Sequence, residues 1–313
     1  MRVIVAGAGA LGSLLGSYLA EAGEDVTLLG REAHVAAICR QGGLRVSGLR
    51  GERLAPLTAV TEIGLSDPEA GLVILGAKTQ DVETVLPVIR PVVGGQTQIL
   101  SPQNGVATED FVADAYGQDR SLAAVTLVNV SLVEPGHIFH AANEHLEFGP
   151  RGVQSAEMVQ SVVDAFRRAG IPASRRDDIM QLKWRKMITF CLGSVINSLT
   201  GAQHLAEDDD ICRLMRQLAE EIIAVAETGQ VTPFPIRPLV EEAYGFWQTF
   251  NPARPWLASV GQDLRRGKSR TEIDFLSGYI VTLGRRYGVS TPANHCLYAL
   301  VKAAGQTDHF KQA

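Results

Sequence analysis

The sequence predicts an α/β amino-terminal domain of the Rossmann type, with a doubly wound and mainly parallel sheet, followed by an all-α carboxy-terminal domain. Three observations predict this architecture. Short apolar segments alternate with helical segments over the first half of the chain, which is typical of a parallel sheet. The first apolar segment leads into a glycine-rich turn, and the last part of the chain shows only helical periodicity. We therefore divide the 313 residues into domains 1–175 and 176–313.

The glycine-rich turn follows the first expected strand, residues 3–6, and precedes a helix expected over 13–22. Gly7 permits a tight turn, Gly9 lets the backbone approach a pyrophosphate, and Gly12 lets the helix pack closely on the strand. The N–H groups at the helix start then face the phosphates. In this context the run predicts a dinucleotide-binding turn made of Gly7, Ala8, Gly9, Ala10, Leu11 and Gly12.

The second strand, expected over 26–29, ends where the adenosine ribose of a bound dinucleotide lies in this fold. Enzymes that use NAD usually place an Asp or Glu there. This chain has Gly30 and Arg31 instead, and a guanidinium can pair with a 2′-phosphate through its fork geometry. The sequence therefore predicts NADP(H), although Glu32 is adjacent and can still bond the ribose.

Further strands are expected over 72–77, 98–101 and 123–130, with additional strands within 44–60 and 137–148. A helix over 153–169 ends at Gly170. Two polar residues follow strands, at the sheet edge where ligands bind in this fold. Lys78 can place positive charge near the cofactor or an anionic substrate, and Asn104 can bond the nicotinamide ribose and a substrate oxygen. Asn104 is also typical of a simple turn.

The second half is expected to be helical, and two of its side chains are candidates for chemistry. Lys186 can protonate an oxygen, and Glu272 can accept a bond from a hydroxyl or position the lysine, although helix spacing alone equally predicts surface charges. The run Asp208–Asp210 is interpreted as a helix start and not as a metal site. Helices are expected over 179–199, 208–229, 238–250, 255–266, 270–287 and 292–304.

Composition excludes several classes of function. The net charge of −5 gives no electrostatic footprint for nucleic acid. The uncharged stretch 187–206 contains several polar side chains, so we expect a buried helix and no membrane partner. We expect the first strand to begin directly at the start of this sequence, without a signal peptide before it. The four cysteines show no metal or disulfide spacing, so we expect reduced, mostly buried thiols and a cytoplasmic location. The helical half offers surfaces on which a homodimer can form.

Taken in order, the motifs of this chain resemble those of the ketopantoate reductases, the NADPH-dependent 2-dehydropantoate 2-reductases. The resemblance covers nearly the whole chain. It is carried by Gly7–Gly12 with Arg31, Lys78-Thr79-Gln80, Gln103-Asn104-Gly105, Pro135–Ile138, Glu147–Gly149, Trp184–Lys186, Asn197–Thr200, Gln262–Leu264 and Thr271–Asp274.

This resemblance implies that NADPH binds the glycine turn and that a small 2-oxo acid, first of all ketopantoate, enters a cleft between the domains. It implies that Lys186 is the proton donor, that Asn104 contacts cofactor and substrate, and that Glu272 contacts one of them. The substrate carboxylate is expected near Ser259 or backbone donors. A related β-hydroxyacid or opine-type dehydrogenase, or a catalytically idle NADPH-binding sensor, remains an alternative.

The chain departs from the family pattern after the lysine. The family has asparagines one and two turns after it, where this chain has Phe190 and Ser194. Asn197 matches the local context and is the candidate substrate ligand, but it lies eleven residues beyond Lys186, about 16 Å along a straight helix. Either the helix bends or bulges near Gly193, or Asn197 is structural and the pocket is built differently.

Overall fold

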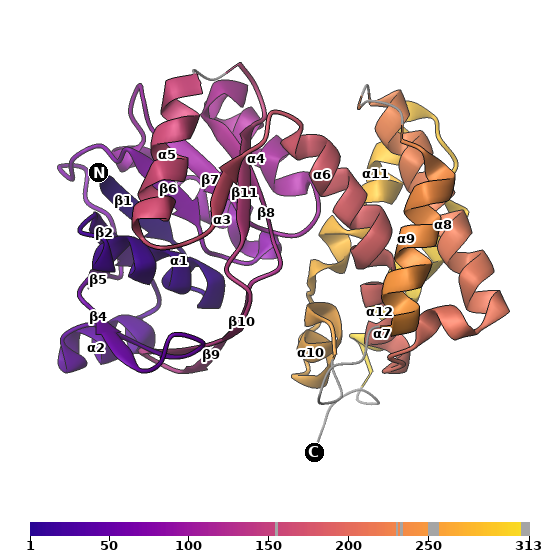
Figure 1. Cartoon of the computed structure of the whole chain (residues 1–313), viewed down its shortest axis with the longest axis horizontal. Coiled ribbons are helices and arrows are strands. Elements are labelled where there is room, and N and C mark those ends of the chain that lie inside the picture. The colour runs from indigo at the N-terminus through magenta and orange to yellow at the C-terminus, as the bar shows by residue number, and fades with distance from the viewer. Residues whose placement is uncertain (154–155, 230, 232–233, 250–256, 308–313) are drawn as a thin grey trace. The chain divides into compact units, whose positions relative to one another are not determined.

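The computed structural model describes residues 1–153, 156–229, 231, 234–249 and 257–307, and it divides into two compact units (Figure 1). The first unit comprises Met1–Gln103 and Thr108–Ile179. The second comprises Met180–Ala313 together with the short segment Asn104–Ala107. A segment that the chain places between two strands of the sheet therefore belongs structurally to the helical unit.

The first unit is built on an eight-stranded sheet with the order β12-β11-β8-β7-β6-β1-β2-β5. The strands from β8 to β5 are parallel to their neighbours, and β11 is antiparallel to β8. Order and direction confirm the predicted, mainly parallel sheet. Its strands are β1 (Arg2–Ala6), β2 (Asp25–Leu29), β5 (Thr58–Val60), β6 (Leu72–Leu75), β7 (Gln98–Ser101), β8 (Ser121–Thr126), β11 (Leu146–Pro150) and β12 (Ala173–Arg175).

Helices cover both faces of this sheet because its apolar strands have two buried faces. Along β1, Val3 and Val5 belong to one hydrophobic cluster, whereas Ile4 and Ala6 belong to another. The first cluster includes side chains of α1 and α5, and the second includes side chains of α3 and α4. The helical segments of the unit are α1 (Ala10–Glu21), α2 (Glu32–Gln41), α3 (Val82–Val85), α4 (Ala107–Tyr116), α5 (Ala156–Arg168) and the 3-10 turns η1 (Thr79–Asp81), η2 (Arg90–Val92) and η3 (Gln118–Arg120).

Of the additional strands expected within 44–60 and 137–148, β3, β4 and β10 form a second sheet of four strands with β9, in the order β4-β3-β10-β9, whereas β5 and β11 belong to the first sheet. The pairing of β10 with β9 is antiparallel, and that of β10 with β3 is parallel. The single strand expected over 123–130 is two strands, since β8 ends at Thr126 and β9 begins at Asn129 in the other sheet. The strands of the second sheet are β3 (Leu44–Gly48), β4 (Arg53–Ala55), β9 (Asn129–Glu134) and β10 (His137–Ala142).

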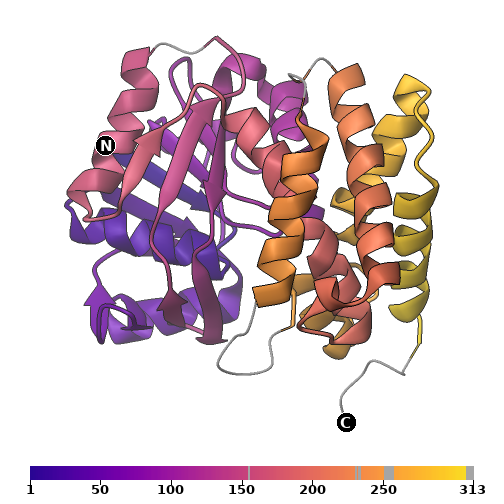
Figure 2. The same cartoon turned by 45° about the vertical axis from the view of Figure 1, so that its right-hand side comes forward.

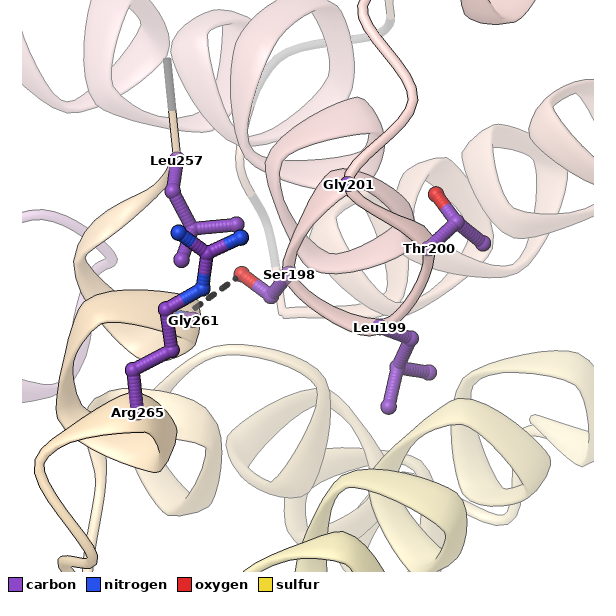
Figure 3. Close-up of a pocket in the computed structure, with 7 residues that line it drawn as sticks. All are labelled: Ser198, Leu199, Thr200, Gly201, Leu257, Gly261 and Arg265. Carbon is purple, nitrogen blue, oxygen red and sulfur yellow. Dashed lines mark hydrogen bonds between the residues drawn. The ribbon is translucent and has the colours of Figure 1, made fainter. Parts of the chain in front are cut away.

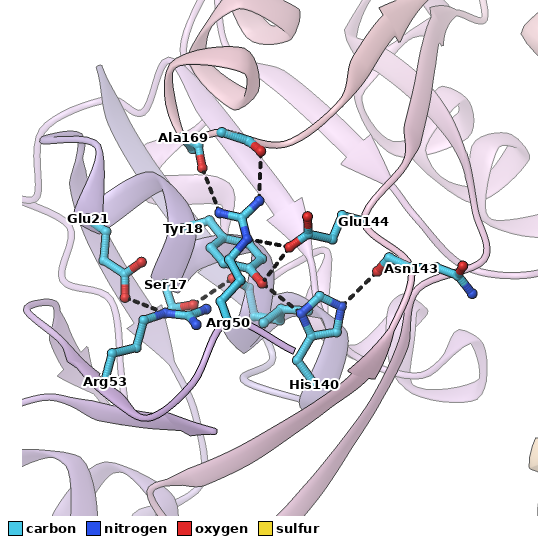
Figure 4. A network of polar contacts seen from close by, with 11 residues as sticks. Ser17, Tyr18, Glu21, Arg50, Arg53, His140, Asn143, Glu144 and Ala169 are labelled. Atoms are coloured by element: carbon cyan, nitrogen blue, oxygen red, sulfur yellow. Dashed lines mark hydrogen bonds and ion pairs between the residues drawn. The ribbon is translucent and has the colours of Figure 1, made fainter. Parts of the chain in front are cut away.

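A buried polar network joins α1 to the second sheet (Figure 4). The Tyr18 hydroxyl lies 2.6 Å from Nδ1 of the fully buried His140, whose Nε2 lies 2.7 Å from the carbonyl oxygen of Asn143. Because a carbonyl oxygen only accepts, His140 Nε2 is the donor to Asn143. The guanidinium groups of Arg50 and Arg53 lie 4.3 Å and 4.6 Å from the centre of the Tyr18 ring. Nothing in the local sequence of α1 indicates this network.

In the described residues of the second unit, every regular element is a helix or a helical turn (Figure 2). Its helices pack alongside one another around a core that includes the fully buried Trp247. Val106 also belongs to this core, which explains why the segment Asn104–Ala107 groups with the helices. The elements are α6 (Ile179–Lys186), a π-helical turn η4 (Met187–Cys191), α7 (Leu192–Thr200), η5 (Leu205–Glu207), α8 (Asp209–Thr228), α9 (Ile236–Thr249), α10 (Ser259–Arg265), η6 (Glu272–Phe275), α11 (Ser277–Tyr287) and α12 (Pro292–Ala304).

Two helices expected to be continuous are interrupted. The stretch 179–199 contains the π turn, and the stretch 270–287 breaks at Leu276, whose φ and ψ are −104° and −106°. Helix α9 begins at Ile236, two residues before its expected start. Residue 250 at the expected end of that helix and residues 255–256 at the expected start of the next lie outside the described residues.

The interpretation of the Asp208–Asp210 run as a helix start is confirmed. The Asp208 carboxylate caps α8 by accepting bonds from the N–H groups of Asp210 and Ile211 at 2.8 Å and 3.0 Å. Among the described residues, no cluster of His, Cys, Asp and Glu has the composition of a metal site. In the same residues, no helix combines the length and apolarity that crossing a bilayer requires. The expectation of mostly buried thiols is wrong for Cys39 and Cys296, which are exposed.

Candidate functional site

The turn between β1 and α1 requires glycine at three positions. Gly7 has a φ of +84°, in the region that favours glycine. A Cβ on Gly9 would lie 2.5 Å from the carbonyl oxygen of Gly76, and a Cβ on Gly12 would lie 2.5 Å from the Gly76 Cα. Gly9 is the N-cap of α1 and no side chain caps it. The first N–H groups of this helix therefore face outward without a side-chain competitor for an anion.

Arg31 is exposed and occupies the N-cap of α2, directly after β2. This helix is held at its first turn and at its last residue by the turn between β9 and β10. The Gln41 amide donates to the carbonyl oxygen of Gly136 at 2.7 Å, and the Gly136 N–H donates to Nδ1 of His34 at 3.0 Å. Gly136 must be glycine here, because its φ is +81° and a Cβ would lie 2.9 Å from that of Ala37. These bonds hold in place the helix that presents Arg31.

The buried His34 makes this docking sensitive to pH. Burial lowers the pKa of His34 below its ordinary value of 6.5, and its Nδ1 must stay unprotonated to accept the Gly136 N–H. Below about pH 6.5 the unfolded chain binds a proton that the folded chain does not, so the free energy of unfolding falls as the pH falls toward the lowered pKa. We expect His34→Gln to reduce the slope of unfolding free energy against pH by up to about 1.4 kcal/mol per pH unit.

Denaturant titrations between pH 5 and pH 7.5 measure this slope. The exposed His295 provides the control, since His295→Gln should leave the slope as it is in the unmodified protein. An unchanged slope in His34→Gln would show that His34 does not titrate differently in the folded and unfolded states.

The loops after β6 and β7 are joined by a residue for which the sequence suggested no role. The Gln103 amide donates to the carbonyl oxygens of Leu75 and Ala77 at 2.6 Å and 3.0 Å. Strand β6 ends at Leu75, so Lys78 lies three residues beyond the strand, at the N-cap of η1. Gln103 therefore sets the spacing of two loops at the sheet edge that carries the glycine turn. The signal that could have identified it was its position directly before Asn104 in the chain.

Lys186 and Asn104, which are 82 residues apart in the chain, meet in the second unit. The Lys186 ammonium donates to Oδ1 of Asn104 at 2.9 Å, and both side chains are partly buried. Lys186 is the last residue of α6, and Asn104 is held by the segment whose Val106 joins the helical core. This contact brings together two of the candidate residues from the sequence. It orients the Lys186 ammonium group, which is an acid, beside the Asn104 amide.

Glu272 and Ser259 form a second pair. The Ser259 hydroxyl donates to the Glu272 carboxylate at 2.7 Å, and Glu272 is buried. The break at Leu276 places Glu272 at the start of η6 and not within a long helix. A Cβ on Gly105 would lie 2.8 Å from the carbonyl oxygen of Phe275, so the turn that carries Asn104 packs against the end of η6. Both pairs therefore lie around one turn of the helical unit.

Asn197 has a different position from the one expected for a substrate ligand. Its side chain is fully buried. Its amide nitrogen donates to the carbonyl oxygen of Ala202 at 2.8 Å, and its amide oxygen accepts from the Ala258 N–H at 2.9 Å. Both ends of the amide thus bond the backbone and hold the segment before Ser259. The helix does bulge, as the first alternative expected, and the bulge is the π turn before Gly193. The described contacts of Asn197 are structural, as the second alternative expected.

A small cavity of about 130 Å³ lies elsewhere in the helical unit (Figure 3). Ser198, whose hydroxyl accepts from the Gly261 N–H at 3.0 Å, and Arg265 are the polar side chains drawn facing each other across it. Ser198, Leu199 and Thr200 of the motif Asn197–Thr200 line it, but none of the candidate catalytic, cofactor-binding or substrate-binding residues does. The cavity contains neither Lys186 nor Asn104, so it does not enter the site.

Two matches to family models and a set of related proteins agree with this fold. Residues 3–152 match the model of the ketopantoate reductase PanE/ApbA family, and residues 178–305 match the model of its C-terminal domain. The chain is 32% identical to the 2-dehydropantoate 2-reductase of Pyrococcus horikoshii over 309 residues, which cover 97% of each protein.

Other relatives give the same picture. The 2-dehydropantoate 2-reductase of Aquifex aeolicus is 29% identical over 307 residues, covering 97% of this chain and 96% of that protein. The crystal structure of a PanE/ApbA family ketopantoate reductase from Ralstonia eutropha is 29% identical and superposes with a TM-score of 0.84 over 98% of this chain and 99% of that one. The chain therefore belongs to the ketopantoate reductase family.

Proposed function

We propose that this protein reduces 2-dehydropantoate to pantoate with NADPH. The observation that carries the proposal is the 2.9 Å hydrogen bond between Lys186 and Asn104, which orients an ammonium group next to an amide in the unit that follows the dinucleotide-binding turn. The related proteins from Pyrococcus horikoshii and Aquifex aeolicus bear the name of this activity. The chain's membership of the family supports the type of reaction, in which an oxidoreductase acts on a CH–OH group.

The residues of the first unit fit a phosphorylated dinucleotide. The turn Gly7–Gly12 has no Cβ at the positions where the backbone must be approached closely, and α1 has no acidic residue in its first turn. The exposed Arg31 at the N-cap of α2 is suited to the 2′-phosphate, and Lys78 adds a positive charge at the same edge of the sheet. When bound, the reduced nicotinamide supplies the hydride for the ketone carbon.

The second unit supplies the groups for the oxygen atoms. Lys186 donates a hydrogen bond to the ketone oxygen and passes it a proton as negative charge develops there. Asn104, which already accepts from Lys186, fixes the direction of the ammonium group. Glu272 accepts a bond from the new hydroxyl, and Ser259, which donates its single hydroxyl hydrogen to Glu272, holds that carboxylate in place. Asn197 is not part of this proposed site.

Spectrophotometric assay of NADPH oxidation with 2-dehydropantoate tests the proposal directly. We expect turnover with NADPH to exceed turnover with NADH, and we expect Arg31→Ala to lower the ratio of the two kcat/KM values by about 10- to 100-fold, because a charge-assisted bond to a phosphate is lost. The exposed Arg40 on the same helix is the matched control, and Arg40→Ala should leave the ratio unchanged. Absence of turnover with 2-dehydropantoate, or turnover only when an amine is added, would contradict the proposal.

A further inference from the structure

We infer that Phe190 forms a rigid apolar wall beside the reacting ketone, so that the site selects 2-oxo acids with an apolar, branched C3 whether or not they carry a hydroxyl on C4. This inference rests on the proposed function, because it places the ketone oxygen at Lys186. It assigns to Phe190 the role of determining specificity and makes the substrate class broader than 2-dehydropantoate alone.

The position of Phe190 follows from the π turn. This turn begins directly after Lys186 and carries Phe190 four residues further along, so that the ring centre lies 5.9 Å from the Lys186 ammonium nitrogen. Phe190 is only partly buried. A partly exposed ring at this distance from a charged amine is available to a molecule that contacts the amine.

The ring is fixed from its other sides. It stacks on Trp247 with centres 6.1 Å apart and an interplanar angle of 28°, and it meets Phe246 edge-on at 5.5 Å. Trp247 is fully buried, and it lies over Gly193, where a Cβ would be 2.0 Å from the indole. Aromatic packing of this kind leaves Phe190 little freedom to turn away. The wall is therefore a fixed part of the helical unit.

The chemistry of the substrate then decides what this wall recognises. A ketone oxygen bonded to Lys186 lies about 2.9 Å from its nitrogen. The C3 substituents are three bonds from that oxygen. When the ketone approaches Lys186 from the side that faces Phe190, they come within van der Waals reach of a ring centred 5.9 Å from that nitrogen. Methyl groups gain contact with the ring, whereas a hydroxyl gains no hydrogen bond from it. In 2-dehydropantoate, C3 carries two methyl groups and one hydroxymethyl group.

Three 2-oxo acids separate the contributions: 2-dehydropantoate, 3,3-dimethyl-2-oxobutanoate, which lacks the hydroxyl, and pyruvate, which lacks the branch. An apolar wall discriminates weakly against loss of a hydroxyl, whereas a site built to bond that hydroxyl rejects the analogue by about 10⁴-fold or more. We expect the kcat/KM values of the first two acids to agree within about tenfold, and that of pyruvate to be lower by about 10²-fold or more, mainly through KM.

Two variants test the role of Phe190 itself. Phe190→Asn places an amide at the wall, and we expect it to raise the preference for 2-dehydropantoate over 3,3-dimethyl-2-oxobutanoate by at least about tenfold. Phe190→Leu keeps an apolar wall and should leave this ratio unchanged. A ratio compares two substrates on one protein, so partial loss of folded enzyme does not alter it.

The outcomes distinguish this inference from the proposed function. Rejection of 3,3-dimethyl-2-oxobutanoate by more than about 10³-fold in the unmodified protein, with 2-dehydropantoate well reduced, would overturn the inference and leave the function standing. An unchanged ratio in Phe190→Asn would also overturn it. Failure to oxidise NADPH with any of the three acids would overturn both.

Discussion

Replacing Lys186 with methionine is expected to lower kcat for the reduction of 2-dehydropantoate by about 10²- to 10⁴-fold. The side chain keeps its approximate length, but the group that donates to the ketone oxygen and to Asn104 is lost. The ketone oxygen then develops negative charge without a proton donor, which is the main electrostatic demand of the reaction. Steady-state assay of NADPH oxidation measures the loss.

Controls separate a chemical effect from a structural one. Arg185, the neighbouring cation, is exposed and pairs with Glu242 at 2.6 Å on the surface, so Arg185→Gln should retain nearly full turnover. The dissociation constant for NADPH should change little in Lys186→Met, because the glycine turn and Arg31 belong to the first unit. Near-normal turnover by Lys186→Met would exclude Lys186 as the proton donor.

Replacing Glu221 with alanine is expected to destabilise the helical unit by about 3 kcal/mol. The buried Glu221 carboxylate on α8 accepts from the N–H groups of Ala293 and Asn294 and from the Asn294 amide, each at 2.9 Å. It thereby caps the start of α12, where the N-cap Thr291 makes no side-chain cap bond. Removing the carboxylate leaves buried donors without their acceptor, at a cost of about 1–3 kcal/mol for each group.

Denaturant unfolding followed by tryptophan fluorescence measures this loss, because all three tryptophans of the chain fall within residues 180–313. The adjacent Glu220 is exposed, and Glu220→Ala should change the free energy of unfolding by less than about 0.5 kcal/mol. Equal effects of the two substitutions would show that the capping bonds contribute nothing beyond helix propensity.

Local patterns in the sequence were sufficient to predict most strands of the main sheet and the glycine turn. An apolar strand followed by Gly7, Gly9 and Gly12 predicted both the turn and the close packing of α1, because short-range sterics determine them. The α12 range of 292–304 was likewise predicted from its periodicity, and the structure confirms it. In these cases the physical cause lies within a few residues of its effect.

The features that the sequence did not predict depend on distant partners. The Tyr18–His140 bond joins residues 122 apart, and neither residue's neighbours indicate it. The π turn is an added residue in a helix whose hydrophobic pattern continues across it, so periodicity could not reveal it. Asn197 was assigned to substrate because its type and context matched, whereas the structure shows the backbone groups of Ala202 and Ala258 using its amide. Tertiary partners decide such roles.

The membership of Asn104–Ala107 in the helical unit has a consequence for how this protein can be recombined. A chimera joined to a homologue at residue 179 would take Lys186 from one parent and Asn104 from the other, although these two side chains are hydrogen-bonded to each other. The functional module is thus discontinuous in the gene. An exchange that preserves it must transplant four residues from the middle of the nucleotide-binding half together with everything after Ile179.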